Sequence, residues 1–248
     1  MAREFEVRRE QDLPATPEQV WDAVATGAGN LGWLYPMEVE PRVGGKATRG
    51  DSTVVAWEPP HHFAVRATQD GGFSNTLTYH IEPADGGGTS HLRMGIHWVH
   101  TGVVDDTWNW ETKTDAAEKH VDFYQHSLAE YLSHFAGRPA VYVKAGRDEC
   151  TDDPADFAAL RRRLGLADAS AVGDRLSLDL PGTDGGSTEV VVDWLDPDFV
   201  GLRGPHALYR FFNGSSWNWP IWLGHHLFAE DMDEEPATKA WDAWLNGA

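Results

Sequence analysis

The 12 histidines of this 248-residue chain are the side chains that most invite metal chemistry. A zinc site needs three or four His, Cys or carboxylate ligands that converge, commonly His residues at i and i+4 on a helix. Three histidines of one predicted helix instead stand at steps of six and eight and point in different directions: His120, His126 and His134. The adjacent pairs at 61–62 and 225–226 would face opposite sides of a strand. No metal site is therefore predicted.

Nucleophilic and nucleotide chemistry also lack their motifs. The chain holds no GxSxG sequence, and its one cysteine, Cys150, lies in the charged stretch "GRDECTDD" as an incidental thiol. Glycine-rich stretches occur at 85–88 and 184–186, but neither continues to GKS or GKT or opens a dinucleotide-binding helix. Both are typical of hairpin turns, and no cofactor is predicted.

General acid-base catalysis is the enzyme chemistry that the residues leave open. An imidazole titrates near neutral pH and suits proton transfer during a cyclisation or a hydration. His100, His120, Glu111 and Asp115 could meet in a cleft beside the predicted helix. His97 alternates with the apolar residues of its strand and is expected to face away from them.

The acidic composition restricts the partners. With 20 basic against 39 acidic residues, the formal charge of −19 would repel a nucleic-acid backbone and an anionic membrane surface. A single cysteine cannot form an internal disulfide, which favours a reducing cytoplasm. The N-terminus "MAREFEVRRE" lacks the apolar run of a signal peptide, and no 18 consecutive residues are apolar. The expected protein is cytoplasmic and binds neither nucleic acid nor membrane.

Alternation and helical spacing predict an α+β unit in the first half of the chain. "FEVRREQDL" alternates as a strand does, and two prolines then precede a helix over "EQVWDAVA". The clearest hairpin joins two alternating arms across "ADGGG", with apolar residues on one face from Leu77 to Trp98. From 114 to 135, apolar residues recur every three or four positions, which predicts a helix of about six turns with one apolar stripe.

The long helix and the sheet together predict an apolar cavity. The helix must bury its stripe against the concave face of a curved antiparallel sheet, and this closure leaves a cleft. A ligand that hides ~300 Å² of apolar surface would gain about 7 kcal/mol there. No catalytic residue is assigned. The candidate ligand-binding residues come from an aromatic loop, the strands and the helix: Trp33, Tyr35, Phe63, Tyr79, Met94, Trp98, Trp110, Val121, Tyr124 and Leu128.

The second half of the chain looks like an abbreviated echo of the first. Pro17 and Pro154 each open a predicted helix, and Trp57 and Trp194 each precede a proline-containing turn, both at an offset of 137. The segment "VGGK" at 43–46 also matches "VGDR" at 172–175, at a different offset. The second half could therefore be a degenerate repeat.

A boundary follows the long helix, where helical spacing is lost and charge accumulates. We expect a helix-grip domain over 1–137, a linker over 138–153 and a smaller α+β unit over 154–248. Within the last of these, "SSWNWPIWLGHH" at 215–226 is predicted as a strand with one wholly apolar face. It would form the aromatic wall of the second unit or cover the first cavity.

The order of these segments resembles the SRPBCC superfamily, whose fold is also called START-like or helix-grip, over roughly residues 4–136. Three motifs carry the resemblance: "PATPEQVWDA" at 14–23, Trp-Glu-Pro-Pro at 57–60 and the "EP...GGGT" hairpin at 82–89. The nearest branch is similar to the heat-shock-protein-90 ATPase activator domain, which has no universal catalytic residues. The resemblance implies a curved antiparallel sheet that grips a long C-terminal helix around a hydrophobic cavity. Members bind lipids, hormones or polyketides, or catalyse their cyclisation.

The chain departs from this pattern because roughly 110 residues follow the gripping helix, where typical members stop. Three functions remain open. The leading hypothesis is the binding of a small hydrophobic molecule in the cavity. The others are a cyclase or hydrolase that acts on an apolar substrate, and a co-chaperone-like module that docks its acidic surface on a protein client. A homodimer is compatible with each.

Overall fold

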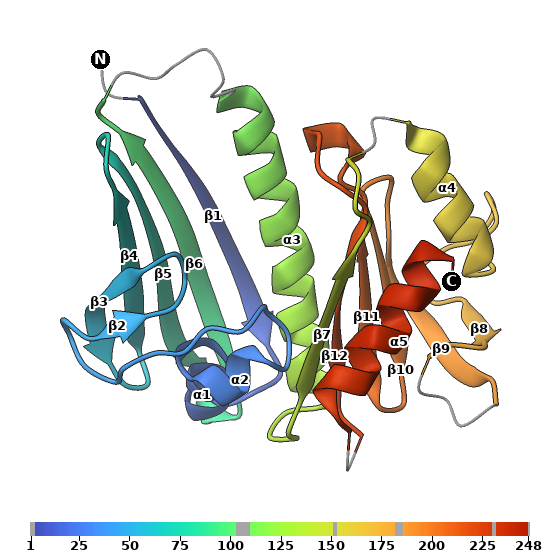
Figure 1. Cartoon of the computed structure of the whole chain (residues 1–248). Helices are drawn as coiled ribbons and strands as arrows, with labels where there is room; N and C mark the ends of the chain where they lie inside the picture. The colour runs from blue at the N-terminus through green and yellow to red at the C-terminus, as the bar shows by residue number, and fades with distance from the viewer. Residues whose placement is uncertain (1–2, 103–109, 151–152, 182–185, 230–231, 248) are drawn as a thin grey trace. The chain divides into compact units, whose positions relative to one another are not determined.

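Two antiparallel sheets of six strands each form the framework of the chain (Figure 1). The sheets belong to unit 1, residues 1–138, and unit 2, residues 139–248. Helices accompany the strands in both units, which confirms the predicted α+β class. The computed structural model describes residues 3–102, 110–150, 153–181, 186–229 and 232–247.

Unit 1 has the strand order β1-β6-β5-β4-β3-β2, so its first strand pairs with its last. The long helix α3 follows β6 and contacts β1, as the helix-grip arrangement requires. Its elements in chain order are β1 (Arg3–Leu13), α1 (Pro17–Ala25), α2 (Gly27–Asn30), β2 (Lys46–Ala47), β3 (Ser52–Glu58), β4 (His62–Gln69), β5 (Phe73–Ala84), the 3₁₀ turn η1 (Asp85–Gly87), β6 (Thr89–His100) and α3 (Trp110–His134).

Unit 2 repeats this topology with the strand order β7-β12-β11-β10-β9-β8. One helix separates its first two strands, where unit 1 has α1 and α2, and another helix again follows the last strand. Its elements are β7 (Val141–Gly146), α4 (Pro154–Arg163), β8 (Arg175–Leu178), β9 (Thr188–Leu195), β10 (Phe199–Gly204), β11 (Ala207–Phe212), the 3₁₀ turn η2 (Ser215–Trp217), β12 (Trp222–Leu227) and α5 (Glu234–Asn246).

The helix starts follow from local sequence. The Thr16 hydroxyl accepts the amide of Gln19, and the Gln19 side chain accepts the amide of Thr16, so a complete capping box precedes α1. Pro17 occupies the first helical position, where its missing N–H costs nothing. The Asp153 carboxylate caps α4 by accepting the amide of Ala155, and proline again comes first. The long helix begins one turn earlier than predicted, at Trp110.

Two polar pairs tie α3 to β1. The Arg9 guanidinium binds the Asp122 carboxylate through two nitrogens, with Nη2 and Oδ2 3.1 Å apart. One turn further along the helix, Nε2 of Gln11 donates to Oε1 of Gln125 at 2.7 Å. A bidentate pair fixes orientation as well as distance. The helix is thereby held at a set angle to the strand.

The aromatic loop after α2 approaches α3 closely at one glycine. A Cβ atom at Gly32 would lie 2.3 Å from Cε2 of Tyr131, so a side chain here would displace the helix or the loop. The next residue, Trp33, is fully buried and donates its indole N–H to the carbonyl of Ala23 at 2.9 Å. These contacts fix the loop beside the helix.

Backbone hydrogen bonds show that the two units are a true structural repeat. The Gly44 amide donates to the carbonyl of Val54 at 2.8 Å, and the Gly173 amide donates to that of Val192 at 2.8 Å. Each valine amide donates back to the residue after the glycine, at 2.8 and 2.9 Å. Both glycines have positive φ, +79° and +99°, which a residue with a side chain rarely adopts. The matched "VGGK" and "VGDR" segments therefore occupy equivalent positions.

A β-bulge directly after that valine also recurs, and it corrects the predicted tryptophan match. The ladders skip Val55 in β3 and Asp193 in β9, so these two residues are equivalent. Trp57 therefore stands one position beyond the equivalent of Trp194. Since a shift of one residue reverses the face of a strand, the match at offset 137 is wrong for the tryptophans. The predicted repeat nevertheless stands on the fold itself.

Two further predictions differ from the structure. Residues 138–153 are not a linker throughout, because β7 lies within them and pairs with β12. The stretch 215–226 is not one strand: η2 occupies its start, Asn218 has a φ of +56°, and β12 begins only at Trp222. A left-handed residue interrupts the extended backbone that the alternation had indicated.

Candidate functional site

A cavity of about 140 Å³ lies in unit 1 between the sheet and the N-terminal half of α3. Strands β5 and β6 form its floor, the aromatic loop forms one wall, and α3 forms the other. The predicted cleft beneath the long helix is thus present. Its lining residues are Trp33, Leu34, Tyr35, Arg49, Leu77, Tyr79, Met94, Ile96, Trp98, Ala117, His120, Val121, Tyr124 and Gln125.

The floor is the apolar face of the predicted hairpin. Leu77 pairs with Ile96 across the two strands, and Tyr79 pairs with Met94. Because side chains alternate between faces, these four residues and Trp98 all project to the same side. They lie toward α3, and the polar residues between them lie on the outer face.

One edge of the cavity is polar. Nε of Arg49 donates to the Tyr35 hydroxyl at 3.0 Å, and Nη1 donates to Oδ1 of Asn75 at 2.6 Å. Arg49 comes from the turn between β2 and β3, so three separate segments meet here. The guanidinium is therefore held in a fixed orientation at the rim.

Tyr79 of β5 is a polar residue of the cavity lining whose side chain is deeply buried. The side chain is 2% exposed, and no residue of the described chain makes a hydrogen bond to its hydroxyl. Burial, and then the nearby Tyr35, raises the pKa of the phenol well above its usual value. Tyr79 is therefore a protonated donor that faces an apolar space.

The helix wall carries three residues with polar atoms. Gln125 is held by Gln11, as described above. The Nδ1 atom of His120 lies 2.7 Å from the carbonyl of Ala116 and must donate to it. In the neutral ring the proton is then on Nδ1, and Nε2 is the basic nitrogen. Tyr124 lies edge-on to Tyr35 with ring centroids 6.2 Å apart.

Seven of the ten predicted residues line the cavity: Trp33, Tyr35, Tyr79, Met94, Trp98, Val121 and Tyr124. Ligand binding by them stays a prediction. Three do not line it. Phe63 packs in the core against Trp21 and Trp57, Trp110 lies against Phe5 at the start of α3, and Leu128 is fully buried one turn beyond the cavity.

Seven lining residues were absent from the predicted ligand-binding set, for different reasons, and His120 among them had been considered only as an acid-base candidate. Leu77 and Ile96 stand on the apolar face of the hairpin, so their alternation was a sufficient signal. Ala117, His120 and Gln125 share the helix face of Val121 at steps of three and four. Leu34 lies between Trp33 and Tyr35, which were both predicted to bind the ligand. Nothing in the sequence pointed to Arg49, whose position depends on contacts with residues 14 and 26 positions away.

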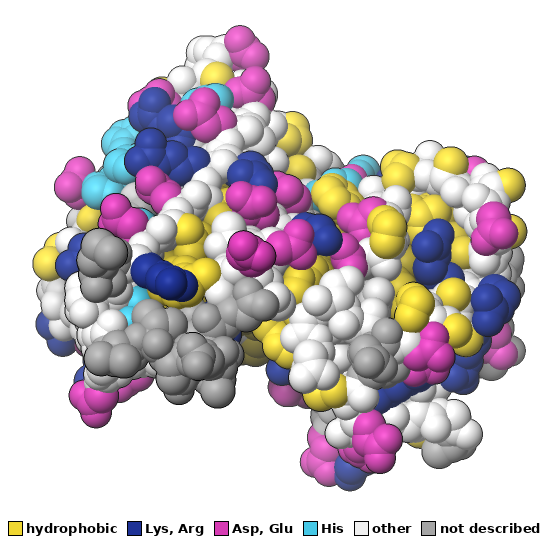
Figure 2. Space-filling model, turned by 90° about the horizontal axis from the view of Figure 1, so that it is seen from above, with side chains coloured by type: hydrophobic (Ala, Val, Ile, Leu, Met, Phe, Trp, Pro, Cys, Tyr) yellow, Lys and Arg dark blue, Asp and Glu magenta, His cyan; other side chains and the backbone are white. Residues whose placement is uncertain are grey.

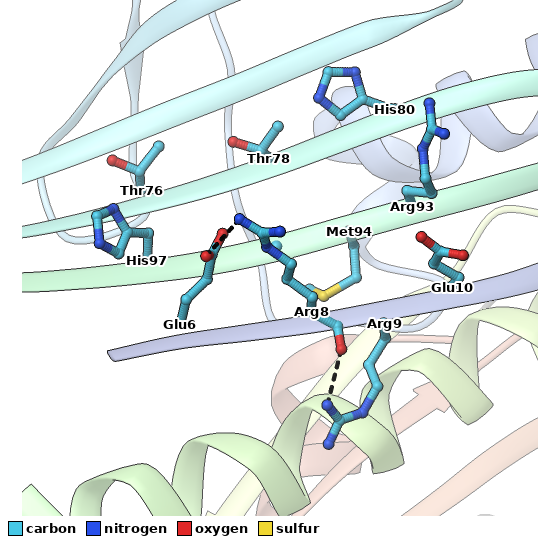
Figure 3. Close-up of a pocket in the computed structure, with 11 residues that line it drawn as sticks. Glu6, Arg8, Arg9, Glu10, Thr76, Thr78, His80, Arg93, Met94 and His97 are labelled. Carbon is cyan, nitrogen blue, oxygen red and sulfur yellow. Dashed lines mark hydrogen bonds and ion pairs between the residues drawn. The ribbon is translucent and has the colours of Figure 1, made fainter. Parts of the chain in front are cut away.

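A wider hollow of about 320 Å³ lies on the outer face of the same sheet, over Gly95 (Figure 3). Charged side chains surround it, and several of them lie beside carboxylates. Arg8 lies 2.7 Å from Glu6 of its own strand, and across neighbouring strands Arg93 lies 2.5 Å from Glu82 and His97 3.2 Å from Glu4. Exposed pairs of this kind contribute little stability. Basic, acidic and histidine side chains are similarly mixed on the face shown in Figure 2. This hollow does not suit an apolar ligand.

The acid-base hypothesis is supported only in part. His120 lines the cavity, but no carboxylate among the described residues does. His97 lies on the outer face, as its alternation predicted. In the described part of the chain, no group of three or more His, Cys, Asp or Glu side chains is placed to hold a metal ion. No described helix has an apolar stretch long enough to cross a bilayer.

Comparison with known proteins agrees with this geometry. The family model "Polyketide cyclase / dehydrase and lipid transport" matches residues 4–130, more than half of the chain. No curated protein matches. Among solved structures, protein MLL2253 of Mesorhizobium loti is 22% identical over 53% of this chain and 98% of its own, with a TM-score of 0.43. The di-domain ARO/CYC BexL is 14% identical over 98% of this chain and 94% of its own, with a TM-score of 0.44.

The resemblance to the SRPBCC superfamily is confirmed by the family match and by the helix-grip fold of unit 1. The activator branch stays a prediction. Such a family points to hydrophobic-ligand binding or a cyclase role. From the matched residues and from the sheet that grips α3, the chain belongs to the polyketide cyclase / dehydrase and lipid transport family.

Proposed function

We propose that unit 1 binds a small apolar molecule that carries a hydrogen-bond-accepting oxygen. The observation that supports this most directly is the Tyr79 hydroxyl, a buried donor that faces the cavity and has no partner in the described chain. A hydrogen bond between this hydroxyl and an acceptor is worth about 0.5–1.5 kcal/mol. A ligand carbonyl would be such an acceptor, and Arg49 and Tyr35 add polar contacts at the rim.

The size of the cavity limits the ligand and its affinity. A volume of about 140 Å³ suits a molecule with one or two rings better than a long chain. Hiding ~200 Å² of apolar surface gains about 5 kcal/mol. A gain of that size corresponds to a Kd of about 0.2 mM before the cost of immobilisation is subtracted, so a Kd of about 1 mM or weaker is expected.

The proposal is tested with 4-fluoroacetophenone, an aromatic ketone observed by fluorine NMR. Tyr79→Phe keeps the ring and removes the donor, so the Kd should rise about 3- to 10-fold. Ala117→Trp places an indole in the cavity and should abolish binding there. Ser133→Trp adds the same indole at an exposed position of α3 and should bind as the wild type does. Unchanged binding by Ala117→Trp would exclude this cavity as the site.

A cyclase is the second candidate, favoured by the donors at the polar edge. Closing a ring by an aldol step moves a proton from carbon to a base and develops negative charge on an enolate oxygen. The attacked carbonyl oxygen then takes up a proton. Arg49 and Tyr79 are donors of the kind that stabilise such an oxygen, and Nε2 of His120 would accept the proton.

Catalysis is tested with 2,5-hexanedione, which closes to 3-methylcyclopent-2-enone with loss of water and is followed by ultraviolet absorbance. A cyclase would form the ring faster than buffer does, and His120→Asn would slow it by about 10²-fold or more. His126→Asn, on the same helix but outside the lining, is the matched control. A rate equal to that in buffer would leave binding without catalysis for this substrate class.

Docking on a protein client and homodimer formation stay predictions. Large apolar side chains exposed in the described chain are few, as is normal for a protein surface. They are Val43, Val55, Val172 and Trp219.

A further inference from the structure

Because the two units repeat one topology, unit 2 has residues at the positions that line the cavity in unit 1. Counting along the ladders from the equivalent valines of β3 and β9 brings Leu77 and Tyr209 to the same position of the sheet. The same count makes Trp98 and Leu227 equivalent. Leu77 and Trp98 both line the cavity of unit 1.

The deep part of this space is filled in unit 2. Trp241 of α5 is 1% exposed, and its ring centroid lies 4.2 Å from His225, 5.5 Å from Tyr209 and 6.3 Å from Phe211. Tyr209, Phe211 and Trp241 belong to the apolar core of unit 2, and His225 is fully buried beside them. A ligand cannot enter there without displacing the indole.

The outer part of the space remains open. A cavity of about 340 Å³ lies where β11 begins and β12 ends, the end of the sheet that corresponds to Trp98 in unit 1. Apolar groups form most of its wall, and Ser187 and Thr188 stand on one side. Its described lining is Pro181, Gly186, Ser187, Thr188, Pro205, His206, Ala207, Tyr209, Leu227, Ala229 and Met232.

The Tyr209 hydroxyl gives this cavity a polar anchor. The side chain is 6% exposed, and no residue of the described chain makes a hydrogen bond to its hydroxyl. Burial raises the pKa of Tyr209 to about 12, so the phenol stays protonated and can only gain from an acceptor. Both units thus present a buried tyrosine donor to an apolar space, one from β5 and one from β11.

We infer that unit 2 carries a second ligand site, at Tyr209, which takes a small apolar molecule with a carbonyl or ether oxygen. The ring or chain of the ligand lies against Ala207, Leu227 and Met232, and its oxygen accepts the Tyr209 hydroxyl. This site does not rest on ligand binding by unit 1, since no residue is shared.

The test is a fluorine NMR titration of the whole chain with 4-fluoroacetophenone. The wild type should bind two molecules. Tyr209→Phe should weaken one of them about 3- to 10-fold and leave the other unchanged, whereas Ala117→Trp should remove only the other.

Two further variants test the second site without changing Tyr209. Oγ of Ser177 donates to Oγ of Ser187 at 3.0 Å, and both residues are exposed. Ser187→Trp and Ser177→Trp therefore lose the same hydrogen bond and gain the same indole, but only residue 187 lines the cavity. Ser187→Trp should abolish the second binding event, and Ser177→Trp should retain it.

Each remaining outcome decides against a site. One bound molecule in the wild type, lost in Ala117→Trp, would overturn the second site and leave the first. Two bound molecules in Ser187→Trp would also overturn it. No binding up to the solubility limit would overturn both proposals for this ligand class.

Discussion

The unfolding free energy of unit 2 is expected to fall by about 1 kcal/mol between pH 6.5 and 5.5 and by about 1.4 kcal/mol per pH unit below that, through His225. The imidazole is fully buried, and its Nδ1 accepts the Arg210 amide at 3.0 Å. Protonation at Nδ1 would break this bond and bury a charge. The pKa of His225 lies well below its ordinary 6.5, mainly because the ring is buried and to a smaller extent because His226 and Arg210 are close.

The direction follows from proton binding. Below pH 6.5 the unfolded chain takes up a proton at His225 that the folded chain does not, so stability is complete above that pH and is lost as the pH falls. Urea denaturation of the whole chain at pH 7.5, 6.5 and 5.5 measures the loss. His225→Asn keeps an acceptor near the position of Nδ1 and removes the titration, so the difference between the two proteins isolates this residue. Parallel pH profiles would contradict the assignment.

Trp241→Ala is expected to destabilise unit 2 by about 3–5 kcal/mol, because it removes a buried indole and leaves a cavity. The indole lies against the rings of Tyr209, Phe211 and His225 and that of Trp244 on its own helix, and it is 1% exposed. The space created corresponds to the part of unit 1 that is already hollow. An apolar cavity of this kind stays dry and accepts a fitting aromatic molecule.

Thermal unfolding measures both effects. Adding indole should raise the Tm of Trp241→Ala more than it raises the wild-type Tm, since the variant gains an extra site and ligand binding to the folded state stabilises it. Trp219→Ala makes the same chemical change at a side chain that is 40% exposed and should cost less than about 1 kcal/mol. Equal Tm losses in the two variants would show that Trp241 does not fill the core.

The elements that form the cavity could be predicted because each is periodic over many residues. Alternation over both arms of the hairpin identified β5 and β6 and their inner face, with η1 between them. Steps of three and four identified α3. Periodicity gives the face of a side chain, however, and not its depth in the fold. Phe63 and Leu128 stand on the correct faces but lie in closed parts of the core.

The polar edge and the second unit were harder to predict, because long-range contacts determine them. Arg49 reaches Tyr35 and Asn75 only after three segments have assembled. In the second unit, β9 corresponds to β3 with Val192 at the position of Val54, an offset of 138, so two tryptophans that match at 137 misled the comparison. β7 was overlooked because its six residues, "VYVKAG", are short and lie beside charged sequence.

The paired glycine–valine bonds and the bulge shared by β3 and β9 bear on how such a protein can change over time. When one fold occurs twice in a chain, selection on each repeat is relaxed. One repeat can then accumulate large aromatic side chains that fill its core, while the other keeps smaller side chains and an open cavity. The changes in unfolding free energy caused by substitutions in unit 1 and in unit 2 should then simply add, since residues without shared neighbours do not influence each other's effects. Redesign for a new ligand can therefore begin in unit 1 and leave the core of unit 2 unchanged.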